Sequence, residues 1–129
     1  MVVDTSVLLA VFFKEKHALW AKTQMKNYQG KLRMSTVNLT EVLILIQDRQ
    51  PQLFEQLKKE VFSLPIRFIP PNILQAEISA AARLKFSSLN LGDCFAYALA
   101  KEESCPVLTL DEDFAKSDIE TLLPEKSDE

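Results

Sequence analysis

The segment LNLGDCFAYALAKEESCPVLTLDEDF, residues 89–114, places two carboxylates at neighbouring element boundaries. Its pattern predicts a helix that begins at Asp93 and runs to about Glu103, followed by a strand over residues 107–110 that ends in Asp111. In a parallel α/β sheet, both positions lie at the edge where ligands and active sites collect. The segment therefore predicts a parallel α/β fold with acidic side chains at the carboxyl edge of its sheet.

The first residues of the chain repeat this arrangement. MVVDTS reads as a short buried strand over residues 1–4 that ends in Asp4, with Thr5 and Ser6 behind it. Further strands are expected at residues 32–35 and 66–69. Helices are expected between the strands, over residues 7–13, about 15–28, 36–47, from Pro51 onward, from Pro70-Pro71 to about Lys85, and 93–103.

Strands that alternate with helices pair in parallel, with right-handed crossovers that place helices on both faces of the sheet. The expected fold class is α/β, a three-layer α/β/α sandwich with a parallel sheet of four or five strands. We expect one domain over residues 1–124 and a polar tail over residues 125–129.

The composition is that of a water-soluble globular domain, with 129 residues, 47% apolar and 26% charged. The longest apolar runs, residues 7–13 and 42–46, are far below the roughly 20 residues that span a bilayer. Cys94 and Cys105 have neither metal-ligand spacing nor the pattern of a disulfide framework. We therefore expect a cytoplasmic protein with no membrane partner. The net charge of −3 argues against nucleic-acid binding through a strong basic field.

Taken singly, most of the acidic side chains have a structural interpretation. Asp93 suits a helix N-cap, Asp111 and Asp113 suit a turn, and Asp4 can cap the helix that follows it. Glu41 is different, because it lies on a helix crowded with apolar residues, where an unpaired carboxylate is costly. For each acid except Glu41, the structural interpretation is favoured over the functional one.

The acids taken together favour a metal site. Asp4 and Asp111 end strands, Asp93 begins a helix, and Glu41 lies on a helix that follows a strand, so all four can converge on one edge of the sheet. Carboxylates that share a cleft repel one another, and a hard divalent cation such as Mg²⁺ or Mn²⁺ relieves this repulsion. The chain has no glycine-rich phosphate loop and one histidine, His17, which disfavours nucleotide kinases, zinc hydrolases and histidine acid–base chemistry.

The sequence resembles the PIN-domain family, in particular its small VapC-like toxins. The resemblance covers nearly the whole chain. It is carried by MVVDTSVLLAVF at the start, STVNLTEVLILI in the first third, LNLGDCFAYALA, and PVLTLDEDF near the end. It implies a Mg²⁺- or Mn²⁺-dependent endoribonuclease, a sheet with the first strand at its centre, a cognate antitoxin and a homodimer.

The resemblance also assigns site residues by position. The family's four acids correspond to Asp4, Glu41, Asp93 and Asp111, which are the expected catalytic and metal-binding residues, and Asp113 is an auxiliary ligand that acts through water. Three hydroxyl residues are supporting candidates: Thr5 or Ser6 would orient Asp4 or a bound water, and Thr109 would do the same for Asp111. Thr5 and Thr109 are equally well explained as ordinary strand-end residues.

The leading hypothesis is a metal-dependent endoribonuclease that hydrolyses RNA phosphodiester bonds, as the toxin of a toxin–antitoxin pair. The alternative is a catalytically silent PIN-like module that binds RNA or protein, although such a module has no physical need for four acids. An aspartate-nucleophile phosphotransferase, suggested by Asp4, is disfavoured because such enzymes want a second acid two residues later, where Ser6 stands.

Overall fold

A computed structural model describes residues 1–125 of the chain. The elements in order are β1 (Val2–Val3), α1 (Thr5–Phe12), α2 (Ala18–Asn27), β2 (Leu32–Ser35), α3 (Thr36–Arg49), the short 3₁₀ helix η1 (Pro51–Leu53), α4 (Phe54–Ser63), β3 (Ile66–Ile69), α5 (Ile73–Lys85), α6 (Leu91–Glu103), β4 (Val107–Leu108), the 3₁₀ helix η2 (Glu112–Lys116) and β5 (Thr121–Leu122). All but the first residue of the tail expected over 125–129 lie outside the described residues.

The sheet has five strands in the order β3-β2-β1-β4-β5, and every pair is parallel. The first strand is therefore central, as the resemblance implied. The strand order reverses between β1 and β4, because the chain moves outward from β1 to β3 and then returns to β4. This reversal places a crevice at the carboxyl ends of β1 and β4, where ligands bind in open α/β sheets.

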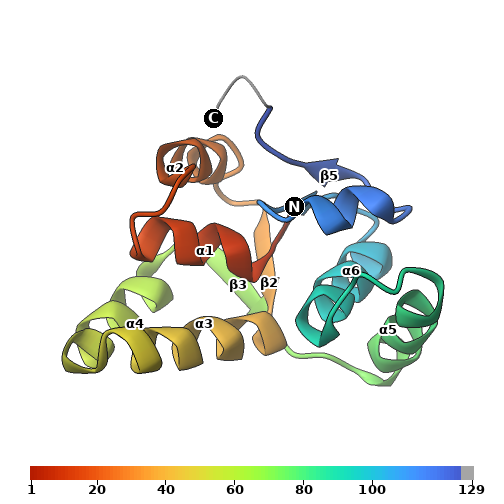
Figure 1. Ribbon diagram of the computed structural model, residues 1–129, viewed down its shortest axis with the longest axis horizontal. Helices are drawn as coiled ribbons and strands as arrows, with labels where there is room; N and C mark the ends of the chain where they lie inside the picture. Colours follow the sequence, from red (N-terminus) through yellow and green to blue (C-terminus); the bar gives the residue numbers. More distant parts are fainter. Residues whose placement is uncertain (126–129) are drawn as a thin grey trace.

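Helices cover both faces of the sheet, which confirms the three-layer prediction. Figure 1 shows α1 to α4 on one side of the strands and α5 and α6 on the other. Alternate residues of the central strands point to opposite faces: Val3 and Leu108 join the core under α1–α4, while Val2 and Val107 join the core under α5 and α6. Among residues 1–125, no helix is both long and apolar enough to cross a membrane.

Several predicted boundaries of strands and helices are wrong. Residues 1–4 and 107–110 give strands of only two residues, so Asp4 and Asp111 lie in the loops that follow rather than in the strands themselves. Asp93 does not begin its helix: Asn90 is the N-cap and Asp93 occupies the third helical position. The expected helix over 15–28 begins only at Ala18, since the preceding residues form a turn.

Helix α6 begins early because Asn90 and Asp93 form a capping box. The Asn90 side chain accepts a hydrogen bond from the Asp93 backbone N–H at 2.9 Å, and the Asp93 carboxylate accepts one from the Asn90 backbone N–H at 3.0 Å. Such a box satisfies two N–H groups that the helix end leaves unpaired. It also fixes the orientation of the Asp93 side chain.

Candidate active site

The first half of the site is a hydroxyl network around Asp4. The Asp4 carboxylate is 3% exposed, and its Oδ2 accepts hydrogen bonds from Ser6 at 2.8 Å and from Thr109 at 2.9 Å. The Thr109 hydroxyl in turn accepts the backbone N–H of Asp111 at 2.9 Å, and the Ser6 hydroxyl accepts that of Leu110 at 3.0 Å. Two hydroxyls thus tie the end of β1 to the loop after β4.

The second half of the site is centred on Asn38, which is fully buried in the first turn of α3. Its amide nitrogen lies 3.0 Å from Glu41 Oε1, 3.0 Å from the Gly92 carbonyl oxygen and 3.2 Å from the Thr5 hydroxyl. Thr5 also donates to Glu41 Oε1 at 2.9 Å. Asn38 therefore joins the start of α1, helix α3 and the start of α6 around the Glu41 carboxylate.

Gly92 allows Glu41 to reach Asp93. A Cβ added at Gly92 would overlap the Glu41 carboxylate, with Oε2 only 2.6 Å away. Glu41 can therefore hold its present position only because Gly92 has no side chain. Gly92 directly precedes Asp93, the third acid, in the sequence.

Electrostatic coupling shows that the four acids form one cluster. The pKa of Asp93 is raised to about 7, mainly by burial and also by the charges of Asp4, Asp111 and Glu41, while the hydrogen bond from the Asn90 N–H opposes the rise. Burial likewise raises the pKa of Asp4; the Ser6 and Thr109 hydrogen bonds oppose this rise, and the charge of Asp111 adds to it. Within residues 1–125, none of these four acids forms an ion pair with Lys, Arg or His.

The other predicted residues take different places. Asp111 is the N-cap of η2, where its Oδ1 accepts the Asp113 backbone N–H at 2.9 Å. The Asp113 carboxylate pairs with Lys116 at 3.1 Å and, among residues 1–125, makes no hydrogen bond with the four acids. Ser6 contacts Asp4 as expected, whereas Thr5 contacts Glu41 and Thr109 contacts both Asp4 and the backbone of Asp111.

The donor set fits a hydrated divalent cation. Carboxylates without a cationic partner are the oxygen ligands that Mg²⁺ and Mn²⁺ prefer. At two of them, Asp4 and Asp93, neighbouring carboxylates help to raise the pKa. In the described part of the chain, no group of three or more His, Cys, Asp or Glu side chains is placed so that it could hold an ion. Mg²⁺ needs fewer direct ligands, because it keeps several waters and binds through one or two carboxylates.

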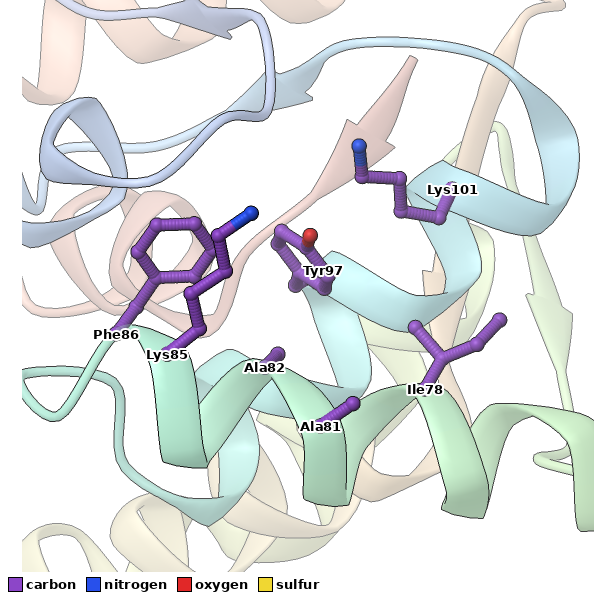
Figure 2. Close-up of a pocket in the computed structure, with 7 residues that line it drawn as sticks. All are labelled: Ile78, Ala81, Ala82, Lys85, Phe86, Tyr97 and Lys101. Carbon is purple, nitrogen blue, oxygen red and sulfur yellow. The ribbon is translucent and has the colours of Figure 1, made fainter.

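A separate pocket of about 340 Å³ lies between α5 and α6, away from the acid cluster. Figure 2 shows its lysines, Lys85 and Lys101, beside the aromatic rings of Phe86 and Tyr97. The Tyr97 hydroxyl donates to Asp118 at 2.6 Å, and Lys101 pairs with the same carboxylate at 3.2 Å. The pocket contains none of the predicted site residues, and Asp118 offsets its positive charge.

The raised pKa values predict how stability depends on pH. The folded-state pKa of Asp93, about 7, lies above its ordinary value of 3.8, so the folded protein favours the protonated form. This contribution to the free energy of unfolding is fully present below about pH 4 and is lost as the pH rises through 7. We therefore compare the melting temperatures of the unmodified protein and of Asp93→Asn in EDTA. The melting temperature of the unmodified protein minus that of the variant should decrease as the pH is raised from 5 to 8. A constant difference across this range would contradict the raised pKa.

Asn38 supplies a second prediction. Asn38→Ala leaves the buried Gly92 carbonyl and one side of Glu41 without their donor, so the free energy of unfolding should fall by about 1–3 kcal/mol. The matched control is Thr40→Ala on the same helix, whose exposed hydroxyl bonds only the Thr36 carbonyl. Urea unfolding of both variants tests this. Equal stability losses in the two variants would show that Asn38 has no special role.

Sequence reasoning missed Asn38, Asn90 and Gly92. A signal existed for Asn90, because Asn-x-x-Asp matches the spacing of a capping box. A signal also existed for Asn38, because it is a polar residue one helical turn before Glu41 on an apolar helix. The partner of both Asn38 and Glu41 is Gly92, more than fifty positions away in the sequence, and no local pattern points to it.

Comparisons with known proteins identify the family of the chain. The PIN domain family model matches residues 1–120. Ribonuclease VapC30 of Mycobacterium tuberculosis is 30% identical over 129 residues, which cover 95% of this chain and 98% of the relative.

Solved structures share the fold at lower identity. The crystal structure of Mycobacterium tuberculosis VapC20, a sarcin–ricin loop cleaving toxin, matches with a TM-score of 0.81 and 16% identity over 95% of this chain and 98% of that one. A toxin–antitoxin complex from Klebsiella pneumoniae matches with a TM-score of 0.77 and 22% identity over 96% and 97%. The chain therefore belongs to the PIN-domain family, and it resembles VapC ribonucleases along nearly its whole length.

Proposed function

We propose that this protein is a Mg²⁺- or Mn²⁺-dependent endoribonuclease that hydrolyses RNA phosphodiester bonds as the toxin of a toxin–antitoxin pair. The observation that carries the proposal is the cluster of Asp4, Glu41, Asp93 and Asp111 at the carboxyl ends of β1 and β4, without a cationic partner among residues 1–125. The ribonuclease names of the relatives supply the reaction class.

Each acid has its own part in the proposed mechanism. Asp4 and Asp93 are the most buried of the four, and hydrogen bonds hold both side chains, so they are the fixed ligands of the ion. Glu41 is held by Thr5 and Asn38 and faces the same space. Asp111 is placed by the Thr109 hydroxyl, and Asp113 would contribute through a water.

A divalent ion bound there would lower the pKa of a water and polarise a phosphoryl oxygen. The hydroxyls of Ser6 and Thr109 keep the Asp4 carboxylate in one orientation, which limits the reorganisation needed when substrate binds. The buried Asn38 does the same for Glu41. The chain thus provides oxygen ligands that are already in place.

The partners follow from the same proposal. The structural neighbours include toxin–antitoxin complexes, which supports a small antitoxin protein as the regulator of this chain. We further propose that the protein acts as a homodimer on cytoplasmic RNA. Size measurement in solution, alone and with a co-expressed antitoxin, tests both assemblies.

The experiment that tests the function is cleavage of a mixed RNA pool by the purified protein with Mg²⁺, Mn²⁺ or EDTA. The expected result is cleavage with either metal and none with EDTA. The competing proposal, a silent PIN-like binding module, predicts RNA or protein binding without cleavage under every condition. The retained acid cluster favours the enzyme, since a binding module gains nothing from mutually repelling buried carboxylates.

A further inference from the structure

A pocket of about 360 Å³ opens directly beside the acid cluster. Its apolar lining comes from Leu9, Ala10 and Leu110. Its polar lining comes from Ser6, Glu15, Lys16 and His17. The Ser6 hydroxyl that lines it also donates to Asp4 at 2.8 Å and accepts the Leu110 N–H at 3.0 Å. The pocket and the proposed metal site therefore share a wall.

The far wall of this pocket is the turn over residues 14–17, which joins α1 to α2. The turn is pinned by hydrogen bonds from the Glu15 N–H to the Ala10 carbonyl at 2.9 Å and from the Ala18 N–H to the Glu15 carbonyl at 3.1 Å. The residues at both ends of the turn adopt the left-handed backbone conformation although neither is glycine: φ is 53° at Lys14 and 70° at His17. Strained backbone of this kind is concentrated at functional sites, because the surrounding structure must maintain it.

His17 is the side chain that this turn presents. Its Nδ1 is buried without a hydrogen-bond partner in the described part of the chain, and the residue lines the pocket together with Ser6 and Leu110. His17 and Glu15 also line a second depression of about 520 Å³ that runs along α2 past Trp20. The two depressions therefore share Glu15 and His17 in their linings.

The charges around the pocket select the part of an RNA strand that fits it. The charges of Glu15 and Lys16 on the rim are opposite, and the acid cluster behind Ser6 is negative, so the lining has no net positive charge that would favour a phosphate group. A nucleobase is neutral, offers N–H groups to Glu15, and has flat faces that suit an apolar lining and an imidazole ring. Pocket size also agrees, since ligand sites of about 300–1,000 Å³ are usual.

We propose that this pocket holds the nucleobase next to the cleaved phosphate, and that His17 and Glu15 determine which base is preferred there. This inference rests on the proposed ribonuclease function and extends it to substrate selection. His17 is a specificity-determining residue in this account, not part of the reaction at the phosphate.

The test uses His17→Asn, because asparagine tolerates the left-handed backbone and removes only the ring. The matched control is Ser104→Asn, an exposed left-handed position with φ of 53° at the far end of α6. Both variants and the unmodified protein cleave a random-sequence single-stranded RNA library, and sequencing of the ends gives the base preference at each position. Glu15→Gln is a second variant on an exposed residue that does not endanger folding.

The expected result for His17→Asn is a relaxed preference at one position beside the cut, with kcat/KM for the preferred base roughly tenfold lower, mainly through KM. Glu15→Gln should alter the preference at the same position, and Ser104→Asn should alter nothing. Unchanged preferences in both pocket variants would contradict the role of the pocket while leaving the ribonuclease intact. No cleavage by the unmodified protein in Mg²⁺ or Mn²⁺ would instead contradict the proposed function itself.

Discussion

Asp4→Asn should lower the rate of RNA cleavage about a thousandfold and leave the fold as stable as before or more stable. An asparagine can still accept the hydrogen bonds from Ser6 and Thr109, so the hydroxyl network survives. What is lost is the negative charge that would hold the metal ion, and an ion contributes several kcal/mol to such a reaction. Burial raises the pKa of Asp4, which means that its charged form is costly in the folded state. The neutral asparagine removes this cost.

The control for Asp4→Asn is Asp48→Asn, which removes the same charge from an exposed position on α3. Cleavage rates and melting temperatures of both variants separate the two effects. An Asp4→Asn protein that cuts RNA at the original rate would remove Asp4 from the site. One that melts far below the unmodified protein would show that Asp4 serves stability instead.

Gly92→Ala should abolish most of the cleavage without unfolding the protein. The new Cβ would overlap the Glu41 carboxylate, which is the far end of a flexible side chain and therefore swings away. Glu41 then loses its place beside Asp93 and its contacts with Thr5 and Asn38. Alanine favours the helix over glycine by roughly 0.5–1 kcal/mol, which offsets part of this loss. The cleavage rate should fall at least about tenfold, toward that of Glu41→Ala.

A double-mutant cycle isolates the cause of this effect. In a Glu41→Ala background the extra methyl group meets no carboxylate, so Gly92→Ala should cause no further loss of cleavage and should raise the melting temperature slightly. If the two losses multiply instead, Gly92 acts independently of Glu41. The steric account would then be wrong.

The order of the helices and strands could be predicted from local sequence patterns. The proximity of the acids could be predicted because the carboxyl ends of parallel strands lie at the same edge of a sheet. Short apolar strands followed by Asp4 and by Asp111 place these residues at one sheet edge once the strands are known to be parallel. Glu41 was recognisable from its cost on an apolar helix. Strand ends were less predictable, because residues 109–110 look like a continuation of the strand. In the structure the Thr109 hydroxyl donates to Asp4, and the Leu110 backbone N–H donates to the Ser6 hydroxyl.

The supports of the acids could not be predicted, because they depend on tertiary contacts. Nothing near Gly92 in the sequence shows that the Glu41 carboxylate occupies the space of its missing side chain. The sequence left open whether Thr5 or Ser6 would orient Asp4, for the same reason: only the packing of α1 against α3 decides which hydroxyl faces Asp4 and which faces Glu41. The positions of the acids along the sequence indicated a metal site, but the hydrogen bonds that orient its ligands required the structure.

If these four acids hold the metal ion that RNA cleavage requires, the cleavage rate must depend on both the ion and Asp93. A single RNA that the protein cuts is incubated with increasing Mn²⁺, using the unmodified protein and Asp93→Asn, whose capping contact with Asn90 an asparagine can keep. The account predicts a rate that saturates with Mn²⁺, stops in EDTA, and is about a thousandfold lower in the variant at every Mn²⁺ concentration. Cleavage that ignores EDTA, or an Asp93→Asn rate equal to that of the unmodified protein, would contradict it.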